Sequence, residues 1–230
     1  FRRVLFRSIP PVQSIFIGTD SNAFKTNLRI THFNGDLLAY NETLAVYDQS
    51  DGWKYFDGYP IGNTDPEPFS YLSSARGYNI FLTGDDKIIF NGFLNAAAHS
   101  FNLNYTPLNV TPGWNLVGNP YPCNYDLEGV IELSSDQSDG MDKTVYFTHE
   151  GDYIYYDVLT NIGIGWDSDI IPPMQGFFVH VTEPSTLNLP VDSKVPDTGV
   201  SPRAKGEYGI KEESLKLIRL ILRNDTLKDE

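Results

Sequence analysis

The residues of this chain best suited to bind a metal ion are the aspartates of a short acidic turn. The sequence Asp-Gln-Ser-Asp-Gly occurs at positions 48–52 and again at 136–140, and Asp142 follows the second copy. Calcium favours several oxygen ligands clustered in such turns, so Asp136, Asp139 and Asp142 are candidate calcium ligands. Their spacing differs from that of an EF-hand loop, and a solvated turn without an ion is the alternative interpretation.

Aromatic side chains near predicted loops are a second group with recognisable chemistry. Flat Trp and Tyr rings at the surface can stack on sugar rings, and Trp53, Tyr55 and Trp166 are the candidates for such a glycan-binding surface. The alternative is that these rings pack in the core or against neighbouring strands, where Trp and Tyr are commonly found.

Catalytic signatures are absent from the sequence. There is no Gly-x-Ser-x-Gly nucleophile motif, and the four histidines are not spaced as a metal site would require. The two carboxylates of a glycosidase must face each other across a cleft, a condition that sequence cannot test. We therefore predict that the protein is not an enzyme and has no cofactor, with calcium as a candidate ion. A hydrolase is an alternative. The histidines are His32, His99, His149 and His180.

The charge of the chain restricts its partners. Among 230 residues, 17 Lys and Arg stand against 30 Asp and Glu, which gives a net charge of -13. This charge argues against nucleic acid and against anionic membrane surfaces, and it allows cationic partners. Because Cys123 is the only cysteine, no disulfide can form within the chain. No apolar run approaches the roughly 20 residues of a membrane-spanning helix, so we predict that the chain does not span a membrane.

Strands must position these groups. Aromatic residues make up 13% of the chain, and many alternate with polar ones, which favours strands over helices. We predict hairpins at 77–90 and 144–156 and further strands at 100–105 and 186–189. These patterns indicate an all-β protein, and we predict a β-sandwich, jelly-roll-like in its strand path.

The first of two framework motifs is Gly-Trp-Asn-Leu-Val-Gly-Asn-Pro-Tyr-Pro at 113–122. Its apolar run predicts a strand, and the Gly-Asn-Pro that follows predicts a fixed corner, because proline fixes its own φ and restricts the residue before it. The predicted structural residues of this motif are Trp114, Gly118, Asn119, Pro120 and Pro122.

The second motif is Ile-Pro-Pro-Met-Gln-Gly-Phe-Phe-Val at 171–179. Its prolines predict an extended approach to a strand that starts near the glycine. Asn119 and Gln175 are predicted to be buried amides that bond neighbouring backbone groups, and Trp114 and Phe177 to lie in the core. The structural residues of this motif are Pro173, Gln175, Gly176 and Phe177.

The chain resembles itself at a constant offset. Val46 and Tyr47, Gly52 and Gly77 are matched 99 residues later by Val145 and Tyr146, Gly151 and Gly176. This offset favours a duplicated β unit, and chance similarity between aromatic strands is the alternative. The predicted organisation is a sequencing artefact at 1–8, the end of a preceding element at 9–36, a sandwich at 37–190 with halves at 37–110 and 111–190, a linker at 191–210 and the first strand of a truncated module at 211–230.

The two motifs, in this order and about fifty residues apart, resemble a pair found in large secreted and cell-surface proteins of Bacteroidetes. In those proteins the segment precedes a C-terminal sorting domain of the type IX secretion system. The resemblance covers roughly residues 37–222, and it departs from the pattern at Cys123, where a small residue such as Ser or Ala is usual. The sorting domain is not present in this sequence, as expected of a fragment.

The resemblance implies an extracellular, all-β segment without catalytic residues. We therefore expect a structural or adhesin-like module of a secreted or surface-anchored bacterial protein, with a surface glycan or a protein as its partner. The alternative is a carbohydrate-binding module attached to a polysaccharide-degrading enzyme.

Overall fold

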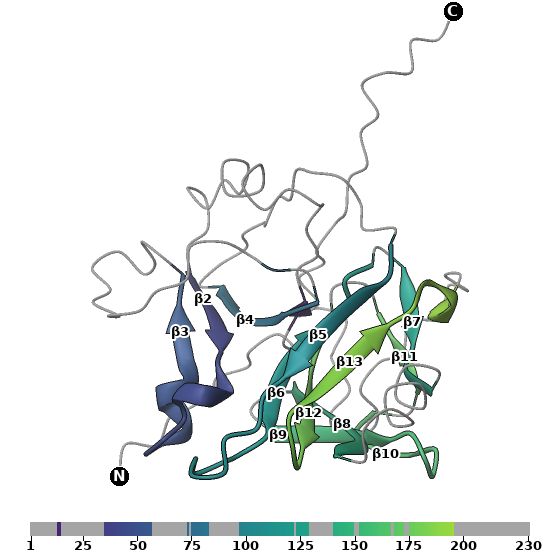
Figure 1. Cartoon of the computed structure of the whole chain (residues 1–230). Coiled ribbons are helices and arrows are strands. Elements are labelled where there is room, and N and C mark those ends of the chain that lie inside the picture. Colours follow the sequence, from purple (N-terminus) through teal and green to yellow (C-terminus); the bar gives the residue numbers. More distant parts are fainter. Residues whose placement is uncertain are drawn as a thin grey trace, which may run out of the picture.

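The computed structural model describes residues 13–14, 35–56, 73, 75–82, 97–121, 123–128, 140–149, 152–166, 168–172 and 175–195 (Figure 1). These residues form mainly antiparallel strands, and the helical elements η2 (Glu42–Leu44), η3 (Gln49–Gly52) and η4 (Val191–Ser193) are short 3₁₀ turns. The predicted all-β class is confirmed. In this part of the chain, no helix has the length and apolar character needed to cross a membrane.

A five-stranded antiparallel sheet occupies the centre of the fold. Its strand order is β10-β9-β8-β12-β6. The two sequence motifs supply β6 and β12, which pair directly with Gly118 opposite Gly176 and Trp114 opposite His180. Segments about fifty residues apart in sequence are therefore neighbours in one sheet. The strands are β6 (Trp114–Gly118), β8 (Met141–His149), β9 (Asp152–Asp157), β10 (Ile162–Ile164) and β12 (Gly176–Val181).

Strands β6 and β12 are buried on both faces. Both have nearly continuous apolar sequences, which are typical of strands covered from two sides. Successive side chains point to opposite faces, so Val117 and Phe177 enter one cluster while Leu116 and Phe178 enter another. The exposed fraction of each of these four side chains is 5% or less.

A four-stranded sheet in the order β1-β4-β2-β3 covers one of these faces. Tyr40 and Ala45, contributed by the end of β2 and the end of η2, pack with Leu116 and Phe178 in the smaller cluster. Figure 1 shows β2, β3 and β4 to one side of the remaining strands. The strands are β1 (Gln13–Ser14), β2 (Gly35–Tyr40), β3 (Trp53–Tyr55) and β4 (Gly77–Leu82).

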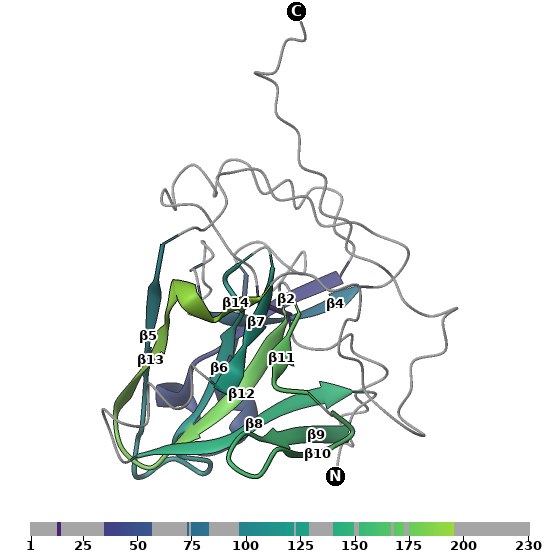
Figure 2. The same cartoon turned by 90° about the vertical axis from the view of Figure 1, so that its right-hand side faces the viewer.

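The main core lies on the opposite face of the central sheet. There the pair β5 and β13 contributes Leu103, Leu187 and Leu189, and the sheet β11-β7-β14 contributes Tyr125 and Ile171. Figure 2 shows β5 and β13 at one side of the molecule, next to β6 and β12. The strands are β5 (His99–Leu103), β7 (Asn124–Asp126), β11 (Ile170–Ile171), β13 (Ser185–Leu189) and β14 (Lys194–Val195).

The four-stranded sheet, which we call the first sheet, also meets the edge strand β6 of the central sheet through the residues that lead into β4. The N–H of Gly118 donates to the carbonyl of Ala75 at 2.9 Å, and Arg76 forms an isolated bridge with Val117. A Cβ atom on Gly77 would lie 2.4 Å from the carbonyl oxygen of Val117, so only glycine allows this approach. The described strands thus form four sheets, the central one and three others, and the sandwich with a jelly-roll path stays a prediction.

The sheets extend past the predicted sandwich boundaries. Gln13 and Ser14 pair with β4, and Lys194 and Val195 pair with β7, so residues assigned to a preceding element and to a linker belong to the same body. The linker prediction missed β14 because a two-residue strand carries no periodic signal. The predicted artefact at 1–8 and the module at 211–230 lie outside the described residues.

The positions that suggested duplication have different local structures. Gly77 and Gly176 each begin a strand, β4 and β12. Val145 and Tyr146 lie in β8, whereas Val46 and Tyr47 lie in a bend outside any strand. Gly151 lies outside the described residues, and duplication stays a prediction.

Candidate functional site

The corner after β6 is held by the side chain of Asn119. This residue is fully buried, and its amide nitrogen donates to the carbonyl oxygens of Cys123 and Pro172 at 2.8 and 3.0 Å and of Ile171 at 3.3 Å. Its amide oxygen accepts from the N–H of Tyr121 at 2.9 Å. One amide thus joins the corner of the first motif to the approach of the second.

Gln175 holds the start of β12 in a similar way. Its buried side-chain amide donates to the backbone carbonyl of Gly176 at 2.7 Å, and its backbone carbonyl accepts from the N–H of Asn119 at 3.0 Å. The prediction that Asn119 and Gln175 are buried amides bonded to nearby backbone is confirmed. Phe177 is in the core as predicted, whereas Trp114 is half-buried at the edge of the smaller cluster.

The remaining described motif residues lie at the strand ends and in the corner. Gly118 ends β6, Gly176 begins β12, and Pro120 is buried in the corner between them. Pro122 and Pro173 lie outside the described residues.

Asn115 and Glu42 are structural polar residues that sequence reasoning missed. Asn115 is buried in β6 and bonds both the N–H and the carbonyl of Asn104 at 2.9 Å. Glu42 is 2% exposed, and its carboxylate accepts from the N–H and hydroxyl of Thr106 at 2.8 Å and from the N–H of Gly113 at 3.0 Å. No sequence signal marks these two, because their partners become neighbours only in the fold.

Of the three glycan candidates, Trp53 and Tyr55 lie in the same strand β3, whereas Trp166 lies in the main core. Trp166 is 5% exposed and its ring stacks on Phe147 with ring centres 4.4 Å apart, so its assignment to a glycan surface is wrong. Trp53 is half-buried, with its ring edge-on to Tyr40 at 5.2 Å. Tyr55 lies opposite Leu38 in the pair β2 and β3. Packing against neighbouring rings, the alternative interpretation, holds for both tryptophans.

The calcium candidates can be checked only in part, because Asp136 and Asp139 lie outside the described residues. The carboxylate of Asp142 is 2.7 Å from Nδ1 of His180 on β12. A carboxylate bound to an imidazole in this way is less available to a metal ion, and Asp142 is described here as a partner of His180.

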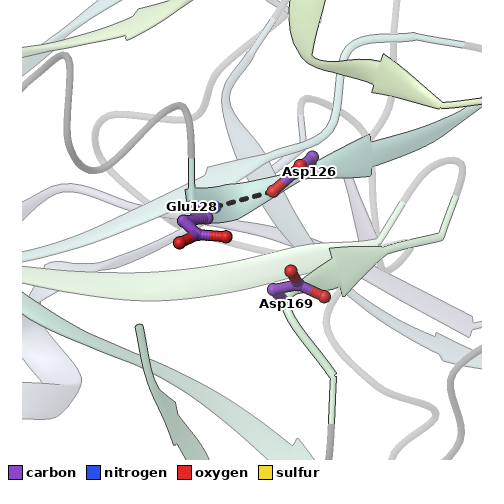
Figure 3. A group of neighbouring side chains, drawn as sticks. All are labelled: Asp126, Glu128 and Asp169. Atoms are coloured by element: carbon purple, nitrogen blue, oxygen red, sulfur yellow. Dashed lines mark hydrogen bonds between the residues drawn. The ribbon is translucent and has the colours of Figure 1, made fainter. Parts of the chain in front are cut away.

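Three other acids are gathered by the pairing of β7 with β11. Asp126, Glu128 and Asp169 each offer a carboxylate oxygen, and these atoms lie within 4.8 Å of one another (Figure 3). The N–H of Leu127 donates to the carbonyl of Asp169, which fixes the two chain segments side by side. Hard cations such as calcium prefer oxygen ligands, but calcium takes 6 to 8 of them and exposed acids often cluster without an ion.

A group of half-buried rings lies on the central sheet. Trp114 of β6, Tyr146 of β8 and Tyr155 of β9 form a continuous set, with ring centres 4.9 Å apart for the first pair and 6.0 Å for the second. We call these three residues the aromatic row. All three are half-buried. The sequence predicted the 144–156 hairpin but not its register, which places Tyr146 opposite Tyr155 on one face of the sheet.

Polar groups flank the aromatic row. Asp157 accepts from the hydroxyl of Thr144 at 3.0 Å and from the N–H of Thr160 at 2.8 Å. Although burial alone would raise the pKa of Asp157, the bonds from Thr160 and Thr144 bring it below the ordinary value. Burial, followed by the charge of Asp142, raises the pKa of Tyr146, so its hydroxyl remains a hydrogen-bond donor at neutral pH.

Comparison of the chain with protein-family models, with curated proteins and with solved structures finds no match.

Proposed function

We propose that this chain is a non-catalytic structural and adhesive β module of a secreted or surface-anchored bacterial protein. The proposal rests on the observation that the buried polar side chains of the two motifs bond the protein's own backbone. Asn115, Asn119 and Gln175 are buried and bond the backbone of the chain itself. The motifs therefore serve to build a fixed framework, and contact with partners is left to the surfaces that the framework displays.

The packing of the central sheet supports a rigid display framework. Its strands β6 and β12 bury side chains in two clusters on opposite faces, so the sheet is fixed from both sides. Close-packed interiors resist deformation. Surface residues attached to this sheet are consequently held in constant relative positions.

The extracellular location rests on the resemblance of the two motifs to the segment before type IX sorting domains. The acidic charge of the chain, -13, suits a soluble surface module that does not bind nucleic acid. The single cysteine, Cys123, is half-buried and unpaired, so the fold does not depend on a disulfide within the chain.

Antibody labelling of the source bacterium tests the location. Antibodies raised against the folded chain should label intact cells or be depleted by protein from the culture medium, and external protease should remove the surface signal. A periplasmic protein should remain unlabelled as a control. Labelling that requires permeabilised cells, with no antigen in the medium, would contradict the proposal.

A further inference from the structure

We infer that the aromatic row of Trp114, Tyr146 and Tyr155 is a binding surface for an uncharged polysaccharide. The inference rests on the proposed adhesive function and names its ligand class. The proposed binding surface lies on the central sheet. It takes the place of the glycan-binding surface predicted from the sequence at Trp53, Tyr55 and Trp166.

The row crosses the central sheet obliquely, because Trp114 lies opposite His180, two residues further along β12 than Phe178. Tyr146 lies opposite Tyr155 between β8 and β9, and Phe178 lies opposite Tyr146 between β12 and β8. Phe178 is buried beneath the four-stranded sheet together with Tyr40, and Trp114 and Tyr146 pack against the same cluster. The row therefore emerges from a packed cluster, which anchors its rings.

The face is open at the β9 and β10 end. Tyr153 is 60% exposed, and Ile162 and Ile164 of the edge strand β10 are 61% and 53% exposed. Ile164 lies opposite Tyr155 and Ile162 lies opposite Asp157, so these side chains extend the same face. A ligand chain laid along the row would thus contact rings at its centre and apolar side chains at its end.

Hydrogen-bonding groups lie beside the rings. Thr144 is bonded to Asp157 across β8 and β9, and His180 is bonded to Asp142 with its ring 5.0 Å from that of Trp114. Sugar hydroxyls both donate and accept, and these side chains provide hydroxyl, imidazole and carboxylate groups next to surfaces on which sugar rings stack. A surface that offers both aromatic rings for stacking and fixed polar groups for hydrogen bonds is complementary to a saccharide.

The charges argue for an uncharged ligand. Asp142 and Asp157 border the row of a chain whose net charge is -13, and they disfavour an anionic polymer. Both carboxylates already bind a neighbouring side chain, His180 or Thr144, so a cationic peptide would gain less from them than from free acids. A neutral polysaccharide needs no compensating charge.

Affinity electrophoresis with soluble polysaccharides tests the inference. The panel contains neutral galactomannan, xyloglucan and mixed-linkage glucan, and anionic pectin, with a lysine-rich peptide measured separately by tryptophan fluorescence. We expect at least one neutral polymer to retard the folded chain. Tyr155→Ala should weaken that binding by about tenfold or more, because it removes a stacking surface, and Tyr155→Phe should retain most of it.

Tyr47→Ala is the matched control, because Tyr47 is 89% exposed and lies outside the central sheet. It should leave binding unchanged. Thermal unfolding identifies variants that no longer fold, and Tyr153→Ala at the exposed end of the same face replaces Tyr155→Ala if the latter fails this check.

Three results would overturn the inference. These are failure of every neutral polymer to bind, equal binding by the folded aromatic-row variant and the wild-type chain, and binding of the lysine-rich peptide or pectin in place of the neutral polymers. Each of them leaves the antibody result on location intact, so failure of the ligand assignment is distinguishable from failure of the proposed function.

Discussion

At the scale of single residues, buried polar side chains hold this fold at its corners. Asn119 joins two chain segments by three donated bonds and one accepted bond. Glu42 fastens Thr106 and Gly113 to η2 in the same manner. A buried polar group is favourable only when it is paired, so each of these residues depends on the whole set of its partners.

We expect Asn119→Ala to lower the free energy of unfolding by about 2 to 4 kcal/mol, because it leaves several buried backbone groups without partners. Urea denaturation followed by fluorescence measures this change. Asn102→Ala, at an exposed position of β5, is the control and should change stability by no more than about 0.5 kcal/mol. Equal stability of the two variants would remove the structural role of Asn119.

A second prediction concerns His99 at the start of β5. Burial, followed by the positive charge of Lys194, lowers the pKa of His99 below its ordinary value of 6.5. The folded state therefore disfavours protonation, and the stability contributed by neutral His99 is present above pH 6.5 and is lost as the pH falls toward the folded-state pKa.

We expect the free energy of unfolding to fall between about pH 7.5 and about pH 5.5, and His99→Gln to reduce this dependence, since glutamine does not titrate. Urea titrations of both proteins at several pH values provide the measurement. The difference between the two curves isolates His99 from the other histidines. Parallel curves would show that His99 does not contribute.

At the scale of elements, the entry to β6 depends on the backbone of Gly113. Its φ is 79°, a conformation that disfavours side chains, and an added Cβ would lie 1.8 Å from the carbonyl oxygen of Val181. Its N–H donates to Glu42 and its carbonyl accepts from Val181, so the residue joins η2 to the end of β12.

Gly113→Ala should lower the free energy of unfolding by about 2 to 4 kcal/mol through backbone strain and overpacking. Gly113→Asn tolerates positive φ but carries the same Cβ, so we expect it to be similarly destabilised. Urea denaturation compares both with Ser100→Ala, an exposed change in β5. Recovery of stability in the Asn variant would show that the contact with Val181 is unimportant.

At the scale of the whole molecule, the central sheet separates the main core from the smaller cluster, and consecutive residues of one strand contribute side chains to both. Phe177 faces the main core and Phe178 faces the smaller cluster beneath the first sheet. Because both residues belong to β12, loss of packing on one face of the sheet should also destabilise packing on the other face. We therefore expect the described residues to unfold cooperatively.

Phe177→Ala and Phe178→Ala should each lower the free energy of unfolding by about 3 to 5 kcal/mol. Variants that keep either Trp53 or Trp166 as the only tryptophan, excited selectively, report the smaller cluster and the main core separately. Both reporters should show one midpoint in each variant. Leu159→Ala, at a 76% exposed position, is the control, and separate midpoints for the two tryptophans would contradict cooperative unfolding.

The sequence alone determined the all-β class, the β8 and β9 hairpin, the strands of the two motifs and the buried roles of Asn119 and Gln175. These features depend on local information: alternation repeats every two residues, proline and glycine constrain their own backbone, and turn residues identify corners. The short strand β14 at Lys194–Val195 gave no such signal.

Only the tertiary structure decided which surfaces are available for binding. Trp166 was predicted at the surface, yet it stacks on Phe147 in the core, whereas Tyr155, which is not one of the three glycan candidates, lies in the aromatic row. The acids Asp126 and Asp169 became neighbours through the pairing of β7 and β11. Local periodicity gives the direction of a side chain relative to its strand, whereas burial depends on which distant segment packs over that face.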